Sequence, residues 1–387
     1  MCVRLASALV LLAARAAAAT DYGLRGLATT WETDDDNSIL QLVGLPRAAS
    51  GAKVQVVGPF IWYDSPENSR LELLPCAMAF DAGAAGNASA AGAAAAPRKP
   101  AFFFATGNSL GPVRIYSVDA VSGVLLRNAS VRFAQPLAVT AMAFNSASGL
   151  LDALVFVGPT ATAAPAAASI DPETGAVVLL SARLQLPDFQ GPCEASVAAH
   201  VQAGSRLYFV QQDAKGWQQA NETFLMGLEL ATGNVSRLVP WSPHDGMLSN
   251  VAAVDAAAPG GAELVLYSTS AWDQDLNETA ELTLWALDPV EGASSAAVVA
   301  VVANPEAGDG PLLPTWGTLA IDGTGAARTV SMLCTNNNGR IYTYVVELNV
   351  TVSAHGVAAN GSPQITKIDD SDVTGGMIYR LNRVVAP

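Results

Sequence analysis

The residues best suited to catalysis lie in one short segment, Pro243-His-Asp-Gly246. The chain has three histidines, and only His244 is followed directly by an acid, Asp245. A His–Asp pair can serve as a general base, but it needs a nucleophile or a metal from elsewhere in the fold. The pair therefore favours a hydrolase or lyase only if other titratable side chains converge on it.

Metal and cofactor motifs are weak in this chain. The segment Asp34-Asp-Asp-Asn37 has the oxygen ligands that Ca²⁺ prefers, but its acids are consecutive, so their side chains point apart, and no glycine-bearing calcium loop follows. No two histidines have the spacing of a zinc site, and no phosphate-binding glycine loop is present. We predict neither a metal nor a cofactor.

Three tryptophans, like the His–Asp pair, lie in segments that are followed by a predicted innermost strand. Trp62, Trp241 and Trp316 each precede a run of small, apolar residues. Aromatic rings in exposed loops stack on sugars or anchor peptides, whereas buried ones pack between sheets. The first alternative predicts a binding site for a protein or a glycan, made of Trp62, Trp241, His244, Asp245 and Trp316.

A repeated pattern must position these loops. An acid followed four residues later by glycine ends an apolar run in four places, and the steps between the acids are 52, 58 and 59 residues: Asp119 with Gly123, Asp171 with Gly175, Glu229 with Gly233, and Asp288 with Gly292. A period in this range is typical of a stacked or radial repeat protein with one small sheet per repeat.

Each repeat reads as four antiparallel strands. A run of small residues is followed by an apolar strand, the motif strand and a fourth strand, and the motif glycine closes the last hairpin with φ > 0. The small residues suit a strand near a crowded axis. Five units are complete, spanning 74–135, 138–187, 193–240, 247–303 and 316–367.

The N-terminal unit lacks one strand. It has three candidate strands, 24–32, 38–44 and 53–60, and the segment 376–385 at the other end of the chain can supply the fourth. We therefore predict an all-β fold: a six-bladed β-propeller of four-stranded antiparallel blades, with the first blade closed by the C-terminal strand.

The units resemble the pyrroloquinoline-quinone-type, or quinoprotein-like, propeller repeat, whose consensus runs apolar-Tyr-Ala-Leu-Asp-x-x-Thr-Gly. The resemblance covers most of residues 74–303 and implies a propeller. Family members that bind the quinone carry a tryptophan shortly after the glycine, where this chain has Leu125, Val178 and Arg237, and the adjacent-cysteine pair is also absent. The resemblance therefore implies the fold without the cofactor.

The first 19 residues resemble a secretory signal peptide. Arg4 precedes the apolar run 5–14, and three alanines, 17–19, precede Thr20. That run is about half the length of a membrane-spanning helix. Residues 20–387 then form a single propeller domain with a low-complexity insertion at 82–97, and we predict no membrane insertion.

Seven Asn-x-Ser/Thr sequons support passage through the secretory pathway, because such sites carry N-glycans on exposed loops of secreted proteins. In Asn360-Gly-Ser362 the sequon is followed by Pro363, which makes it the poorest acceptor. The seven acceptors are Asn87, Asn128, Asn221, Asn234, Asn277, Asn349 and Asn360. The expected location is extracellular or in the lumen of the secretory pathway.

The net charge bears on possible binding partners, and the cysteine content bears on disulfide pairing. Loss of Arg4 and Arg15 with the signal lowers the formal charge from −14 to −16, which disfavours nucleic acid and anionic membrane. Three distant cysteines stay in the mature chain, and we predict that all three are unpaired: Cys76, Cys193 and Cys334.

These observations favour a secreted, N-glycosylated β-propeller that binds a protein or a glycan and does no chemistry. The alternative is a secreted hydrolase or lyase that acts in the axial funnel with His244 and Asp245. A third alternative is a quinone-dependent oxidoreductase.

Overall fold

The structure is a computed structural model. It describes residues 23–31, 37–46, 52–64, 77–83, 98–106, 113–158, 163–181, 184, 197–203, 205–212, 223–239, 247–254, 263–270, 281–305, 312–315, 318–323, 325–337, 341–354, 356–369 and 377–383. The predicted signal peptide, most of the insertion at 82–97, Cys76 and Cys193 lie outside these residues.

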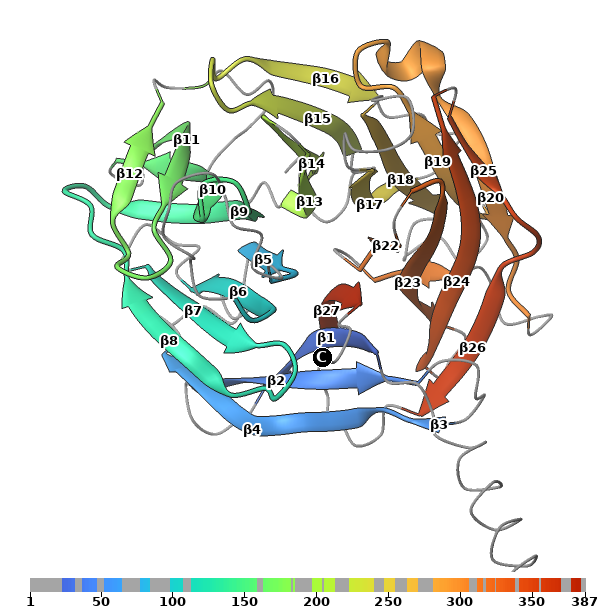
Figure 1. Cartoon of the computed structure of the whole chain (residues 1–387), viewed down its shortest axis with the longest axis horizontal. Coiled ribbons are helices and arrows are strands. Elements are labelled where there is room, and N and C mark those ends of the chain that lie inside the picture. Colours follow the sequence, from blue (N-terminus) through green and yellow to red (C-terminus); the bar gives the residue numbers. More distant parts are fainter. Residues whose placement is uncertain are drawn as a thin grey trace, which may run out of the picture.

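The described strands form six sheets set around a common centre, as Figure 1 shows. Five of them are four-stranded antiparallel blades. Blade 1 has the order β27 (Met377–Arg383), β1 (Leu24–Trp31), β2 (Asn37–Leu45) and β4 (Gln55–Asp64). Blade 2 has the order β5 (Ala77–Asp81), β6 (Ala101–Thr106), β7 (Arg114–Asp119) and β8 (Leu125–Ser130).

The next three blades follow the same plan. Blade 3 is β9 (Leu137–Asn145), β10 (Leu150–Val157), β11 (Ala164–Ile170) and β12 (Val177–Leu180). Blade 4 is β13 (Val197–Ala203), β14 (Arg206–Gln212), β15 (Thr223–Glu229) and β16 (Val235–Val239). Blade 5 is β17 (Met247–Val254), β18 (Leu264–Ser270), β19 (Leu282–Leu287) and β20 (Ala297–Val302).

The sixth sheet, here called the last sheet, departs from this plan. It contains seven strands: β21 (Leu313–Pro314), β22 (Ala320–Asp322), β23 (Ala327–Asn337), β24 (Ile341–Ser353), β25 (Gly356–Ala359), β26 (Gln364–Asp369) and β3 (Ala52–Lys53). The all-β propeller with mostly four-stranded antiparallel blades is thus confirmed. The prediction of six four-stranded blades is wrong, because five have four strands and the last unit is larger.

Residues 52–64 are divided between two sheets. Their first two residues, β3, pair in parallel with β26 of the last sheet, and the Val54 N–H donates to the Asp369 carbonyl at 2.8 Å. The rest forms β4 of blade 1. The single strand predicted over 53–60 is therefore interrupted at Val54, because only part of it lies beside β2.

The C-terminal segment lies in blade 1. Strand β27 pairs antiparallel with β1, from Leu24 opposite Arg383 to Thr29 opposite Met377. In Figure 1 it lies on the inner side of β1. The residues predicted to supply the missing strand of blade 1 thus pair with the strand that was expected.

The acid-to-glycine motif forms the last hairpin of blades 2 to 5. The four motif glycines have φ between 64° and 73°, and each donates its N–H to the carbonyl of the motif acid at 2.8 Å. The carboxylates of Asp119, Asp171 and Asp288 accept the N–H two residues on. The Thr174 hydroxyl also donates to Asp171 and holds the pKa of that carboxyl below its usual range.

Two of these glycines also join one blade to the next. A Cβ on Gly123 would lie 2.1 Å from the Val57 carbonyl oxygen of β4, and one on Gly175 would lie 2.1 Å from the Ser130 carbonyl oxygen of β8. In quinone-binding proteins of the quinoprotein-like type, a tryptophan after the motif glycine is expected to pack between blades. In this chain the backbone of Gly123 and Gly175 itself contacts the outer strand of the preceding blade.

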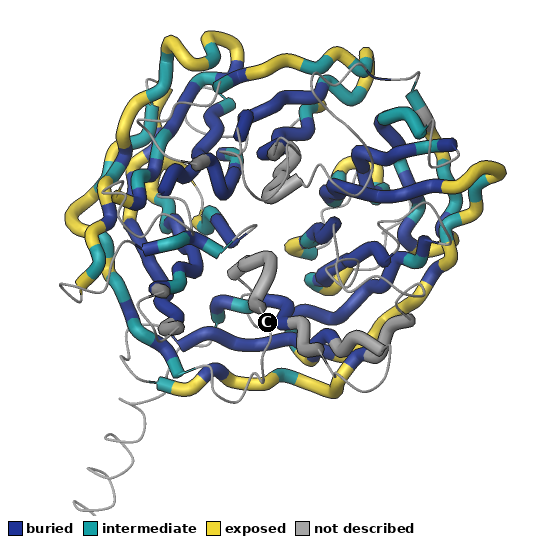
Figure 2. The backbone as a smooth tube through the Cα atoms, turned by 180° about the vertical axis from the view of Figure 1, so that it is seen from behind, coloured by how far each residue is buried: buried dark blue, intermediate teal, exposed yellow. Residues whose placement is uncertain are grey.

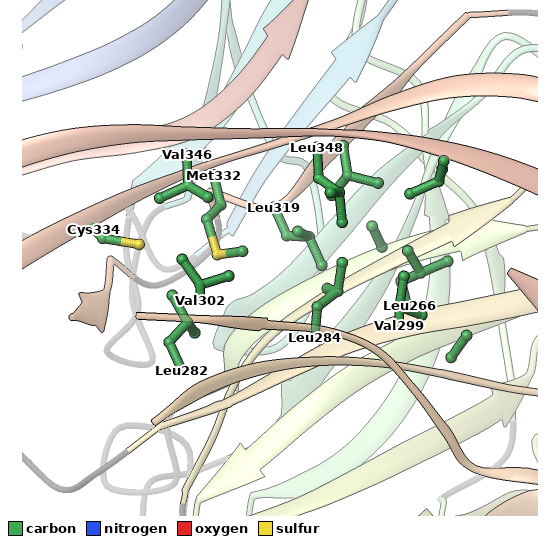
Figure 3. Packing of buried hydrophobic residues seen from close by; sticks show 14 of the residues in the cluster. Leu266, Leu282, Leu284, Val299, Val302, Leu319, Met332, Cys334, Val346 and Leu348 are labelled. Atoms are coloured by element: carbon green, nitrogen blue, oxygen red, sulfur yellow. The ribbon is translucent and has the colours of Figure 1, made fainter. Parts of the chain in front are cut away.

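The cores lie between the faces of neighbouring sheets. Figure 3 shows the largest cluster, where Leu282 and Leu284 of blade 5 pack toward Met332, Val346 and Leu348 of the last sheet. Figure 2 shows buried backbone inside the ring and exposed backbone at the rim. Helix is scarce in the described ranges: the one helical element there is the 3₁₀ turn η2 (Gly292–Ser295), and none is long and apolar enough to cross a membrane.

Candidate functional site

The innermost strand of the last sheet is broken where the sequence places Trp316. Strands β21 and β22 both pair with β23, Pro314 opposite Cys334 and Ala320 opposite Ser331. The described residues between them, Thr315, Thr318 and Leu319, belong to neither strand, and we call these three residues the Trp316 turn. The unit predicted over 316–367 omits β21, which precedes it and pairs with β23.

A buried amide from the neighbouring blade holds both sides of the Trp316 turn. Asn250 lies in β17, and its side chain is fully buried. Its Nδ2 donates to the Thr315 carbonyl at 3.1 Å, and its Oδ1 accepts the Thr318 N–H at 3.0 Å. The amide thus takes the place of a β-ladder partner for the two residues that flank positions 316 and 317.

Bonds within the last sheet fix the same turn. The Thr318 hydroxyl lies 2.6 Å from the Thr315 carbonyl oxygen and accepts the Leu333 N–H at 3.2 Å, while the Thr315 N–H donates to the Leu333 carbonyl at 2.8 Å. These groups of Thr315 and Thr318 therefore have partners without a long ladder. Such a network fixes the backbone on either side of Trp316 before any ligand arrives.

We expect Asn250→Ala to lower the free energy of unfolding by about 1–3 kcal/mol, because it leaves the buried Thr318 N–H without its partner and removes one of the two donors to the Thr315 carbonyl. Urea denaturation of both proteins measures the change. The control is Thr174→Ala, which removes an exposed hydroxyl bound to Asp171 and should cost well under 1 kcal/mol. Equal losses in the two variants would show that the Asn250 bridge is dispensable.

Other buried polar side chains gather at the same end of blade 5 and the last sheet. Asn336, near the end of β23, is fully buried, and neither its Oδ1 nor its Nδ2 has a hydrogen-bond partner. An unsatisfied buried amide is rare and costly in a folded protein. This group, which we call the polar end, comprises Ser249, Asn250, Ser268, Ser270, Thr318 and Asn336.

The polar end contains few groups that could do acid–base chemistry. The nearest thiol, Cys334, is unpaired and fully buried, and burial raises its pKa, so it stays protonated and inert. Ser249 and Ser268 bond to each other, with 3.1 Å between their Oγ atoms. Within the described part of the chain, no group of three or more His, Cys, Asp or Glu side chains could hold a metal ion.

The predicted ligand-binding residues have different outcomes. Trp62 was expected in a loop, but its backbone lies in β4 and pairs with Ile39, because the ladder between β2 and β4 continues to Asp64. Trp241, His244, Asp245 and Trp316 lie outside the described residues. The segments that contain them are bounded by β16 and β17 and by β21 and β22.

The four sequons that the structure describes are exposed: Asn128, Asn234, Asn349 and Asn360. Asn128 lies on the outer strand β8, as predicted. Asn349 was also expected on an outer strand, but β24 has β23 on one side and β25 on the other. Asn87, Asn221 and Asn277 lie outside the described residues.

Sequence reasoning missed Asn250 and Asn336. The small, apolar run predicted as the innermost strand starts at Val251, so Asn250 was placed in the loop before it, whereas β17 already begins at Met247. Asn336 begins the run Asn336-Asn-Asn-Gly339, a pattern that predicts a tight turn, but β23 continues to Asn337, and Asn336 pairs with Tyr342. The run of three asparagines predicted the hairpin but not which residue lies within the sheet.

Neither a protein-family model nor a curated protein matches the sequence. Solved structures that are similar include a mutant of the Synechocystis apocarotenoid oxygenase, with 10% identity over 91% of this chain and 74% of that chain at a TM-score of 0.41. A GH74 xyloglucanase from Xanthomonas campestris has 13% identity over 84% and 52%, at 0.35.

A quinohemoprotein alcohol dehydrogenase from Pseudomonas putida has 12% identity over 84% of this chain and 54% of that chain, at a TM-score of 0.33. The propeller fold that the quinoprotein-type resemblance implied is shown by the sheets themselves. The reactions of these proteins are not transferred to this chain.

Proposed function

We propose that this chain is a secreted, N-glycosylated β-propeller that binds a protein or a glycan at the polar end, without chemistry of its own. The observation that carries the proposal is the Asn250 bridge, which holds Thr315 and Thr318 on either side of Trp316. Flanking backbone that is already fixed lowers the entropic cost of binding, as binding loops require.

The unsatisfied amide of Asn336 supports the same location. A buried polar group without a partner lowers stability, and proteins keep such groups mainly where function uses them. The exposure of Asn128, Asn234, Asn349 and Asn360 agrees with glycans on the outer surface.

A screen of the secreted protein against a glycan array and by pull-down from extracellular fluid tests the proposal. We expect a ligand whose affinity falls at least tenfold in Trp241→Ala and in Trp316→Ala, because central aromatic residues carry most of the binding energy at such sites. Asn336→Leu should raise stability, because it removes an unsatisfied buried amide, and should weaken the same ligand.

Phe60→Ala is the matched control, because Phe60 is an aromatic residue 55% exposed on the outer strand β4. Its binding should equal that of the unmodified protein. Unchanged binding in both tryptophan variants would place the site elsewhere. Turnover of a bound sugar or peptide that is lost in His244→Ala would instead favour the hydrolase or lyase.

We further propose that β27 closes the ring. Besides its pairing with β1, a second link joins the first and last sheets: β3, from the N-terminal part of the chain, pairs with β26. A shared core with Leu24, Val43, Leu333, Val345 and Ile368 lies between those two sheets. Joining the two ends in this way would hide the sheet edge that an open ring exposes.

A further inference from the structure

Two of the exposed sequons are direct neighbours across one hairpin. Strands β24 and β25 pair with Val350 opposite Ala359, and the Asn360 N–H donates to the Asn349 carbonyl at 2.8 Å. The pairing therefore continues one residue beyond β25, with Asn349 opposite Asn360. Opposed residues of an antiparallel pair have Cβ atoms about 5 Å apart.

Both asparagines belong to the outer face of the last sheet. The alternate residues Val350 and Val352 are buried in the core, whereas Asn349, Thr351 and Asn360 are exposed. Because opposed residues project to the same side of a sheet, glycans on Asn349 and Asn360 would start side by side. N-glycans are bulky, so two of them at this position would crowd each other.

The two amides differ in what they already bind. Asn360 Nδ2 donates to the Thr351 hydroxyl at 2.8 Å, and Asn360 Oδ1 lies 3.1 Å from the same oxygen. Thr351 is itself the third residue of the Asn349 sequon. Asn349 uses its Oδ1 to accept from the Thr329 hydroxyl at 3.1 Å, and no described hydrogen bond involves its Nδ2.

A sugar on Asn349 therefore leaves the described bonds of this face in place. A sugar on Asn360 would replace one of the two hydrogens on the nitrogen that donates to Thr351, and it would start beside that bond to β24. The sequence also disfavours a glycan on Asn360, because Pro363 directly follows that sequon. Both differences favour Asn349 as the acceptor.

We propose that this pair takes a single N-glycan, on Asn349, while Asn360 stays unmodified and ties β25 to β24. In the reaction, Asn349 Nδ2 forms a bond to C1 of a lipid-linked oligosaccharyl diphosphate and loses one proton, and the bond from C1 to the diphosphate breaks. We expect chains with one glycan on this pair to form the β24–β25 hairpin more readily than chains with two. This inference rests on the proposed secretion of the chain.

One tryptic peptide tests the proposal, because no Lys or Arg lies between Arg340 and Lys367 and the peptide 341–367 holds both sequons. The full chain is secreted from a eukaryotic host, digested and examined by mass spectrometry, with enzymatic deglycosylation in ¹⁸O water to mark each occupied site. We expect one mark, at Asn349. Doubly marked peptide should be less abundant by about tenfold or more, the ratio that one displaced contact of ordinary strength produces.

Two matched variants complete the test. Asn360→Gln should leave the glycan on the peptide unchanged, and Asn349→Gln should remove it. Predominant double marking, or a mark on Asn360 with Asn349 empty, would overturn the proposal. Marks on Asn128 and Asn234 in the same digest show that the chain met the glycosylating enzyme, so an unmarked 341–367 beside them refutes this inference alone. No mark on any sequon refutes both it and the proposed glycoprotein.

Discussion

Gly175→Ala is expected to lower the free energy of unfolding by about 2–6 kcal/mol, because two costs of about 1–3 kcal/mol each fall on one residue. Gly175 has φ +70°, a conformation that L-residues with a Cβ rarely adopt. Its new Cβ would lie 2.1 Å from the Ser130 carbonyl oxygen and 2.6 Å from the Ser130 carbonyl carbon.

The neighbouring atoms at Gly175 cannot move cheaply, because they are backbone. The Arg132 N–H donates to the Gly175 carbonyl at 2.9 Å, and Arg132 pairs in parallel with Ala176. The hairpin of blade 3 is thereby bonded to the chain that leaves β8 of blade 2. Relief of the clash requires the two blades to separate at this point.

Gly325→Ala is the matched control for this prediction. Gly325 has φ +68°, and no atom lies within 4 Å of a Cβ built there. Alanine at this position should cost only the left-handed conformation, about 1–2 kcal/mol. Urea denaturation of both variants separates the cost of the left-handed conformation from the cost of the backbone clash at Gly175. Equal losses would show that close approach between blades 2 and 3 adds nothing to the glycine requirement.

A chain that ends at Asp370 is expected to melt at least 10 °C lower than the full chain, taking about 2 °C per kcal/mol for a domain of this size. The truncation removes β27 and with it the partner of β1 from Leu24 to Thr29. It also uncovers Leu27 and Ala28, whose side chains are fully buried. The free edge of β1 should promote association, which light scattering would detect.

The control for the truncation is a chain that ends at Arg383, which keeps all of β27. Its melting temperature should match that of the full chain. If both truncated chains melt together with the full chain, β27 does not hold the ring closed. The pairing of β3 with β26 would then be the main link between the first and last sheets.

Local patterns in the sequence were enough to predict the hairpins. Asp119 and Gly123 illustrate why: the carboxylate accepts the Val121 N–H at 2.8 Å, and the glycine adopts φ +71°. Both features depend on residues within one turn, so they recur wherever the spacing recurs. Apolar runs likewise predicted strands over 24–32 and 38–44, which correspond to β1 (Leu24–Trp31) and β2 (Asn37–Leu45).

The candidate site depended on contacts between residues far apart in the chain. Asn250 meets Thr315 and Thr318 only because β17 and the last sheet lie side by side in the ring. A sequence pattern does not report such a partner, because no fixed spacing links the two segments. The same reason explains the division of residues 52–64 between two sheets, since Val54 is held by Asp369.

The sequence by itself thus determined the all-β repeat, the turn chemistry of its hairpins and the pairing of the chain's two ends. These follow from short-range conformational preferences and from a period that each unit repeats. Tertiary structure alone decided that the last sheet has seven strands, that its inner strand breaks at the Trp316 turn, and that Asn349 lies opposite Asn360. Those features arise where backbone groups find partners in another sheet or across an added hairpin, and the partners exist only once the ring is formed.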